Sequence, residues 1–264
     1  MGASEDDDIH DPAVVAALYD ACAPRYDRWT ARASFGLVHG WRRAAVRRLV
    51  GLRHVGRVSG GRLTHAPGAA PRVLDLMAGT GALWPHLLSA FPRARITALD
   101  LSGGMRRVAL ERRPGGPDCP EAYLQGSALE VPLEAEGFDL VTCTFGVKTL
   151  SPAQQTRLAR VIARSLRPGG AFVVLEASDP VGWWLRPLYR AWLDRIVPFT
   201  ERLGGHGGRE FAMLGVYTQV FGDCGRLATA LRDAGLVASE ARHAGGMATS
   251  VAGIKPIAPA DAPA

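Results

Sequence analysis

Apolar side chains recur at helical spacing near the N-terminus, which places them on one face of a helix. They are Val14, Val15, Leu18 and Tyr19, followed by Val46, Leu49 and Val50. Residues 1–52 are therefore predicted to form an N-terminal helical cap. Residues 53–71 are rich in Gly, Arg, Ser and Pro without periodicity, and we interpret them as a flexible linker.

From residue 72 onward, short apolar segments alternate with helix-like segments. The apolar segments are 73–76, 96–99, 140–145 and 172–175, and the helix-like segments between them are 82–91, 104–112 and 152–166. This alternation is typical of a parallel sheet with helices on both faces, a doubly wound α/β fold. A helix near 224–234 and strands near 236–242 and 248–255 complete the predicted core, which spans residues 72–255.

Residues 180–222 interrupt this alternation and are rich in aromatic side chains, namely Trp183, Trp184, Tyr189, Trp192, Phe199, Phe211 and Tyr217. We predict a helical insertion that covers the substrate. Some of its aromatic residues are expected to line an apolar chamber and others to pack on the core. Residues 166–170 are predicted to end a helix in a tight turn, and residues 256–264 to form a disordered tail.

The composition limits the class of protein. A chain of 264 residues with 47% hydrophobic residues can bury one sizeable core. Its longest apolar runs have the length of strands, so no membrane-spanning helix is predicted. An acidic N-terminus without an apolar run and four scattered cysteines favour a soluble cytoplasmic protein with no metal site. The net charge of +6 is spread along the chain, so no nucleic-acid partner is expected.

A glycine turn after the first predicted strand is the strongest chemical signal. Asp75 ends that strand, and Gly79 and Gly81 precede a helix, where backbone N–H groups can approach a ligand closely. Asp100 closes the next strand about 20 residues later, where carboxylates bind ribose hydroxyls. The glycines alone would fit an ordinary turn, but the two acids at neighbouring strand ends favour a ligand with a ribose.

The same segment distinguishes between two ribose-bearing cofactors. The dinucleotide fingerprint requires a third glycine, and Trp84 stands at that place. A carboxylate at Asp75 would repel a pyrophosphate, whereas it suits the cationic amino-acid part of S-adenosylmethionine (SAM). SAM is therefore the predicted cofactor, with S-adenosylhomocysteine as its product, and NAD is disfavoured.

Several motifs lie between residues 20 and 255. They are Ala23-Pro24-Arg25-Tyr26-Asp27, Ser34-Phe35-Gly36-Leu37, Trp41-Arg42-Arg43, residues 75–81, Asp100-Leu101-Ser102 with Met105, Phe138-Asp139, Thr144-Phe145-Gly146, residues 166–170, Leu175-Glu176, Gly245-Gly246 and Lys255. Together they resemble class I SAM-dependent methyltransferases and, within them, the UbiE family, which C-methylates rings in ubiquinone and menaquinone biosynthesis. The likeness covers most of residues 20–255. The resemblance implies a Rossmann-like, mostly parallel seven-stranded sheet.

The resemblance also implies roles for single residues. Thr80 and Asp100 are expected to contact SAM, Ser127 and Ala128 to flank its adenine, and Thr144 to lie beside it. The full predicted cofactor set is Tyr26, Asp75, Met77, Ala78, Gly79, Thr80, Gly81, Asp100, Leu101, Ser127, Ala128, Leu129, Thr144 and Phe145. Tyr26 is further expected to close over the methyl donor.

The chain departs from the family pattern at three places. Ser127 stands where the family has an acid or amide beside the adenine, and Ala82 replaces an acidic residue. Lys148-Thr149 replaces an Arg-Asn pair that lies in the reaction pocket of the family. These changes disfavour an ordinary quinone-pathway substrate and favour a paralogue in natural-product biosynthesis.

Methyl transfer from a sulfonium mainly requires positioning in a dry pocket, but a carbon nucleophile on a phenol ring also needs an ionised oxygen. Lys148 is predicted to hold this oxyanion, with a salt-bridged lysine as the alternative. Tyr26 is predicted to line the reaction pocket. His206, flanked by four glycines, is predicted to titrate on a lid, with a plain surface histidine as the alternative. Asp27 and Glu176 either face a ligand or pair with arginines.

The leading hypothesis is a C-methyltransferase that acts on an aromatic, quinol-like or other hydrophobic small molecule. O- or N-methylation needs the same cofactor site and is the first alternative. The second is a SAM-binding protein of methyltransferase fold that catalyses a cyclisation without methyl transfer. A homodimer is also left open.

Overall fold

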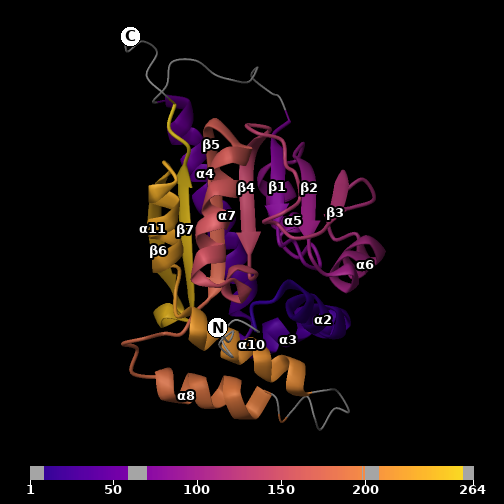
Figure 1. Cartoon of the computed structure of the whole chain (residues 1–264), viewed down its shortest axis with the longest axis vertical. Coiled ribbons are helices and arrows are strands. Elements are labelled where there is room, and N and C mark those ends of the chain that lie inside the picture. Colours follow the sequence, from indigo (N-terminus) through magenta and orange to yellow (C-terminus); the bar gives the residue numbers. More distant parts are fainter. Residues whose placement is uncertain (1–8, 59–69, 198, 200–207, 258–264) are drawn as a thin grey trace, which may run out of the picture.

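The structure is a computed structural model of the chain and describes residues 9–58, 70–197, 199 and 208–257. Figure 1 shows a central sheet with helices on both of its faces and a group of helices across one end. Of the predicted linker, residues 59–69 lie outside the described part, as do His206 and residues 258–264 of the predicted tail.

Seven strands form one sheet in the order β3-β2-β1-β4-β5-β7-β6, in which only β7 runs antiparallel to its neighbours. Their bounds are β1 Arg72–Leu76, β2 Arg95–Asp100, β3 Ala122–Gln125, β4 Phe138–Thr144, β5 Leu166–Ala177, β6 Val237–His243 and β7 Ala248–Ile254. This topology confirms the predicted doubly wound, mostly parallel sheet. The order reverses between β1 and β4, and in such sheets ligands bind at the carboxyl ends beside that reversal.

The sequence pattern missed β3. This strand is only four residues long, lies at the edge of the sheet, and has no fully buried residue. Its extended conformation depends on pairing with β2, which its own composition does not indicate. A short, half-exposed edge strand carries too few apolar positions for a periodicity argument.

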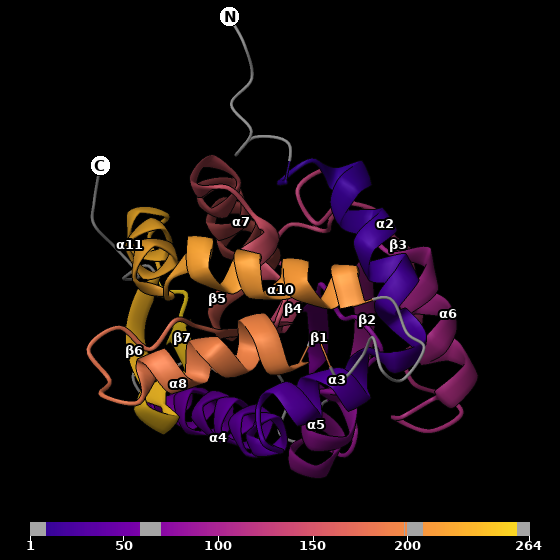
Figure 2. The ribbon, with the colours of Figure 1, turned by 90° about the horizontal axis from the view of Figure 1, so that it is seen from below.

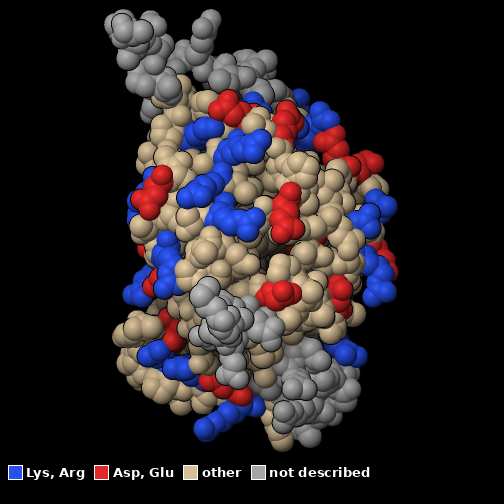
Figure 3. All heavy atoms as spheres, in the orientation of Figure 1, with Lys and Arg blue, Asp and Glu red and all other residues tan. Residues whose placement is uncertain are grey.

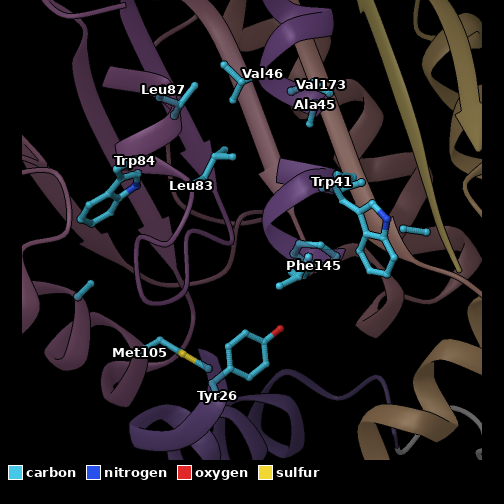
Figure 4. Close-up of a cluster of buried hydrophobic side chains, with 14 of the residues drawn as sticks. Tyr26, Trp41, Ala45, Val46, Leu83, Trp84, Leu87, Met105, Phe145 and Val173 are labelled. Atoms are coloured by element: carbon cyan, nitrogen blue, oxygen red, sulfur yellow. The ribbon is translucent and has the colours of Figure 1, made fainter. Parts of the chain in front are cut away.

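Two layers of helices bury the two faces of the sheet. Helices α4 Leu37–Val58, α5 Trp84–Ala90 and α6 Gly103–Arg112 pack on one face, and α7 Pro152–Ser165 and α11 Gly225–Asp233 pack on the other. Figure 4 shows part of the first layer, where Trp84, Leu87 and Val46 lie among strands and helices. Helix α7 begins with a capping box between Ser151 and Gln154.

The predicted turn at residues 166–170 belongs to the start of β5, because the strand begins at Leu166 directly after α7 ends. Gly169 has a φ of 76°, as expected for a glycine in a turn. The pairing of β4 with β5 shifts register between Phe138 and Leu140. The turn is therefore built into the strand as an irregularity.

The N-terminal cap consists of α2 Pro12–Cys22, the 3₁₀ turn η1 Ala23–Arg25, α3 Tyr26–Ala33 and the first part of α4. Helix α4 continues to Val58, so residues 53–58 are helical and not linker as predicted. The helix is long because its inner face packs along β5 and β7. Arg48 reinforces this contact by donating to Ser250 and Ser239.

The insertion contains α8 Arg186–Ala191, the π-helical turn η3 Trp192–Ile196 and α10 Gly208–Phe221. Seen from below, α8 and α10 lie across the same end of the sheet as α2 and α3 (Figure 2). Segments far apart in the sequence thus cover the carboxyl ends of the parallel strands.

The charged side chains on the face shown in Figure 3 have both signs. Among the helices that the structure describes, none has the length and apolarity needed to cross a membrane.

Candidate active site

A cavity of about 1030 Å³, counting space open to solvent, lies at the carboxyl ends of β1, β2 and β4. We call it the strand-end cavity. Its walls are the loops that follow β1, β2, β3 and β4, with α2 across its mouth. The predicted cofactor residues on these walls are Tyr26, Met77, Ala78, Gly79, Thr80, Asp100, Leu101, Ser127, Ala128, Leu129, Thr144 and Phe145. Asp75 and Gly81 do not line the cavity.

The glycine turn has the backbone geometry that the sequence predicted. Gly79 and Gly81 have φ values of 57° and 75°. A Cβ on Gly81 would lie 2.6 Å from the ring of Trp84, so this glycine is required by packing as well as by backbone conformation. Gly81 thus supports the turn by packing against Trp84, and its contact with the cofactor stays a prediction.

Asp100 lies at the end of β2 and organises the loops around it. Its carboxylate accepts hydrogen bonds from the backbone N–H of Gly79 at 2.7 Å and of Ser102 at 2.9 Å. Burial raises the pKa of Asp100 to about 6, although these two hydrogen bonds lower it. The carboxylate is thus held rigidly at the cavity wall, where a ligand with hydroxyl groups can donate to it.

Asp75 lies deeper than the sequence predicted. It pairs with Ala98, two residues before the end of β2, and its side chain is 1% exposed. Its two oxygens accept hydrogen bonds from Trp84 Nε1 at 2.9 Å and Thr142 Oγ1 at 2.6 Å. These contacts lie beneath the glycine turn, so Asp75 braces the turn, and its direct contact with the cofactor stays a prediction.

A second cavity, of about 450 Å³, lies between α3, α4 and the insertion. We call it the helical cavity. It is lined by Tyr26, Trp29, Thr30, Ala33, Ser34, Val38, Trp41, Phe145, Lys148, Ala177, Tyr189, Leu193, Leu214, Gly215 and Thr218. Tyr26 and Phe145 also line the strand-end cavity, so these two rings separate the cavities. Figure 4 shows both rings and Trp41 at this boundary.

Lys148 is the charged residue of the helical cavity. Its Nζ lies 3.4 Å from Oε1 of Glu176, and both side chains are almost fully buried. Glu176 also accepts from the backbone N–H of Lys148 and of Ala177. Burial raises the pKa of Glu176, and the neighbouring ammonium opposes this shift. The salt-bridged alternative for Lys148 is therefore realised, and its ammonium group still borders the cavity.

Comparison with known proteins gives the family. The model of the ubiE/COQ5 methyltransferase family matches residues 6–255. The ubiquinone/menaquinone biosynthesis C-methyltransferase UbiE of Syntrophotalea carbinolica is 34% identical over 71% of this chain and 70% of its own length. The demethylmenaquinone methyltransferase of Mycobacterium marinum is 31% identical over 93% of this chain and 95% of its own.

The chain belongs to the ubiE/COQ5 methyltransferase family. Solved structures show the same fold at low identity. A SAM-dependent methyltransferase from Thermotoga maritima superposes with a TM-score of 0.56 at 16% identity, covering 91% of this chain and 99% of the other. Human N-acetylserotonin methyltransferase, crystallised with SAM, gives 0.52 at 18%, covering 90% and 59%.

Membership of the ubiE/COQ5 family makes this chain a SAM-dependent methyltransferase, and the strand-end cavity fits that cofactor. Two polar groups on its wall, the hydroxyl of Tyr19 and Nε of Arg42, are buried and have no hydrogen-bond partner among the described residues. Groups of this kind require a polar ligand. The structure describes no group of three or more His, Cys, Asp or Glu side chains that could hold a metal ion.

Asp27, left open from the sequence, links the cap to the glycine turn of this methyltransferase. Its Oδ1 accepts from Thr80 Oγ1 at 2.8 Å, and its Oδ2 accepts from Arg112 at 2.9 Å. Its partners are therefore neither of the neighbouring arginines. The hydroxyl of Thr80 keeps its lone pairs free to accept a hydrogen bond from a ligand.

The aromatic residues of the insertion divide between several roles. Tyr189 lines the helical cavity, Tyr217 is fully buried against His10, and Trp192 stacks on Phe35 at 4.8 Å between ring centroids. Trp184 is 81% exposed, so it neither lines a cavity nor packs on the core. The side chain of Phe211 lies outside the described part.

Several residues of the strand-end cavity escaped the sequence argument. His10 and Tyr19 come from the cap, Glu130 follows the predicted adenine-side residues, and Arg42 comes from α4. The motif around Trp41 was noticed as part of the family resemblance, but no spacing rule indicates that Arg42 reaches a loop 35 residues further along the chain. Contacts between segments so far apart depend on the tertiary fold.

Proposed function

We propose that this methyltransferase transfers a methyl group from SAM to a ring carbon of a hydrophobic, hydroxylated aromatic small molecule bound in the helical cavity. The observation that supports this proposal is the boundary formed by Tyr26 and Phe145, which brings an apolar, aromatic-lined cavity against the cofactor pocket. A cavity of this kind, with a few polar groups, suits a ring. SAM supplies the methyl group on a sulfonium, with a neutral thioether as leaving group.

The strand-end cavity offers a group for each part of the cofactor. Asp100 accepts from the ribose hydroxyls, and the backbone of the glycine turn follows the chain between the ribose and the amino acid. Ser127, Ala128 and Leu129 flank the adenine. Thr144, at the end of β4, lies beside the cofactor near the cavity boundary.

Lys148 holds the oxygen of the acceptor. An ammonium beside a phenol oxygen favours the ionised form, which arises by loss of the phenol proton to water, and the ionised ring is the stronger carbon nucleophile. As the new C–C bond forms, the C–S bond of the sulfonium breaks, and the methylated ring carbon then releases its hydrogen as a proton to water. Glu176 fixes the position of the ammonium by an ion pair. Tyr26, at the boundary between the two cavities, covers the methyl donor. For His206, the role of a lid residue is proposed from the sequence alone.

We propose that the acceptor belongs to a pathway other than quinone biosynthesis. The Lys148-Thr149 pair stands where the family has Arg-Asn, and this change alters the polar group that meets the acceptor. We therefore propose a specialised-metabolism acceptor for a cytoplasmic enzyme. A homodimer is a further expectation, testable by light scattering.

The experiment is a methyl-transfer assay on purified protein with isotopically labelled SAM. The acceptors are a short-chain demethylmenaquinol, a dihydroxynaphthalene and an aliphatic amine of similar size. From a ring acceptor we expect a product that has gained one labelled methyl group in place of a ring hydrogen, with the label bonded to carbon in the NMR spectrum. A labelled methyl group on oxygen or nitrogen would contradict C-methylation and support O- or N-methylation. Conversion of the acceptor to a product that contains no label would support cyclisation.

Matched lysine variants test the role of Lys148. Lys148→Arg should retain a measurable rate and Lys148→Met should lose at least about 100-fold in kcat with little change in SAM affinity, as is typical when a stabilising charge is removed. Lys255→Met is the control, since Lys255 lies at the far end of β5 beside Glu136. An unchanged kcat in Lys148→Met would contradict the assignment.

A further inference from the structure

Arg42 is a buried cation on the wall of the strand-end cavity. Its side chain lies on α4 and the residue is 4% exposed. No carboxylate lies within ion-pair distance of it among the described residues, and its Nε has no hydrogen-bond partner there. Its guanidinium carbon lies over the ring of Phe145, 5.3 Å from the centroid.

The nearest acids are already committed to other groups. Asp27 and Asp75 act on Arg42 through their charge, and burial opposes them by lowering its pKa. Asp27 is bonded to Thr80 and Arg112, and Asp75 to Trp84 and Thr142. Neither carboxylate can turn to Arg42 without leaving its own partners. A buried arginine in this state calls for an anion from a ligand.

The position of Arg42 identifies which part of the cofactor this anion is. The residue lines the cavity together with Met77, Phe145 and Tyr26, at the boundary with the helical cavity. The predicted adenine residues, such as Ala128, lie on the loop after β3. Because the methyl group has to face the boundary, the methionine part of SAM lies at this end, and its carboxylate is the one anion of the cofactor.

We propose that the guanidinium of Arg42 binds the α-carboxylate of the methionine part of SAM. The planar fork of an arginine matches a carboxylate in a bidentate arrangement, which fixes direction as well as distance. Arg42 is thus a positioning residue: by holding the carboxylate it directs the sulfonium toward Tyr26 and Phe145. The inference rests on the proposed function in one respect, the placement of the acceptor in the helical cavity, and it does not depend on the identity of the acceptor.

The test compares the binding of SAM with that of decarboxylated SAM, which lacks only this carboxylate, by calorimetry. Wild-type protein should bind SAM about 10- to 100-fold more tightly than the decarboxylated compound, the range expected for a hydrogen-bonded charge pair. Arg42→Met should weaken SAM by the same factor and leave decarboxylated SAM nearly unchanged. Arg43→Met, one residue along on the exposed side of α4, is the control and should bind both as wild type does.

Each other outcome contradicts the proposal. Equal affinities of the wild type for the two compounds would show that no residue binds the carboxylate. Equal weakening of both compounds in Arg42→Met would assign Arg42 a structural role. If this variant does not fold, Arg42→Lys, which keeps the charge but loses the fork, decides: an intermediate ratio supports the proposal, and a wild-type ratio contradicts it. Binding requires no acceptor, so a wrong acceptor proposal would leave these results unaffected.

Discussion

The two cavities differ in what builds them. Loops directly after the strands form most of the strand-end cavity, and each loop occupies a place fixed by the register of the sheet. Helices from the cap and the insertion form the helical cavity, and these helices meet only through the tertiary fold. The first cavity therefore depends on local backbone geometry, and the second on the packing of remote segments around one buried ion pair.

The largest effect is expected in the helical cavity. Lys148→Met leaves Glu176 buried and unpaired, so the free energy of unfolding should fall by about 3–5 kcal/mol. The double variant Lys148→Met/Glu176→Gln keeps the volume and the acceptor oxygen without a charge, and should lose clearly less. Chemical denaturation measures both. If the single and double variants lost the same amount, the ion pair would not be what organises this cavity.

The next effect concerns the strand-end cavity. Asp100→Ala removes the carboxylate that we propose accepts from the ribose hydroxyls, together with the anchor of two backbone N–H groups, so SAM affinity should fall by about 100-fold or more. Calorimetric titration with SAM measures this loss. Asp118→Ala, on an exposed loop, is the matched control and should bind SAM normally. If Asp100→Ala bound SAM with wild-type affinity, the proposal that Asp100 binds the ribose would be wrong.

Two alanine substitutions in the glycine turn separate backbone strain from packing. Gly81→Ala combines a positive φ with a contact of 2.6 Å to buried Trp84, and should cost about 2–4 kcal/mol of unfolding free energy. Gly79→Ala meets no atom within 4 Å and should cost only the strain, about 1 kcal/mol. Thermal unfolding of the two variants without cofactor provides the comparison, and equal losses would argue against a packing role for Gly81.

The smallest effect is a dependence of SAM binding on pH. The pKa of Asp100 is raised from 3.8 to about 6 in the cofactor-free protein, and ribose binding needs the ionised form. SAM affinity should therefore fall below pH 6, by up to about tenfold per pH unit. Stability without SAM responds oppositely, since the buried carboxylate favours its proton and its contribution to unfolding free energy decreases from pH 4 to pH 6. Asp100→Asn should abolish this dependence of the affinity.

The sequence predicted the strand-end cavity better than the helical one for physical reasons. Strand ends, a glycine turn and the acid at Asp100 are local patterns, and parallel strands bring their carboxyl ends together without further information. The predicted strand 73–76 ends at the same residue as β1, but the sequence does not indicate that Asp75 is bonded to Trp84 and Thr142. The segments that line the helical cavity come mainly from α3, α4, the loop after β4 and the insertion, and no sequence pattern indicates that they meet. Only the structure shows that Arg42 has no ion-pair partner among the described residues.

One feature links the two regions, the carboxylate of Asp27, which ties α3 to the glycine turn through Thr80 and to α6 through Arg112. The cap and the sheet are therefore expected to open as one cooperative unit in hydrogen exchange, with similar protection in α3 and in the turn. Asp27→Ala should uncouple them, so that α3 exchanges faster while the central strands do not. Without this carboxylate, α3, which lines the helical cavity, would be able to move independently of the strand-end cavity.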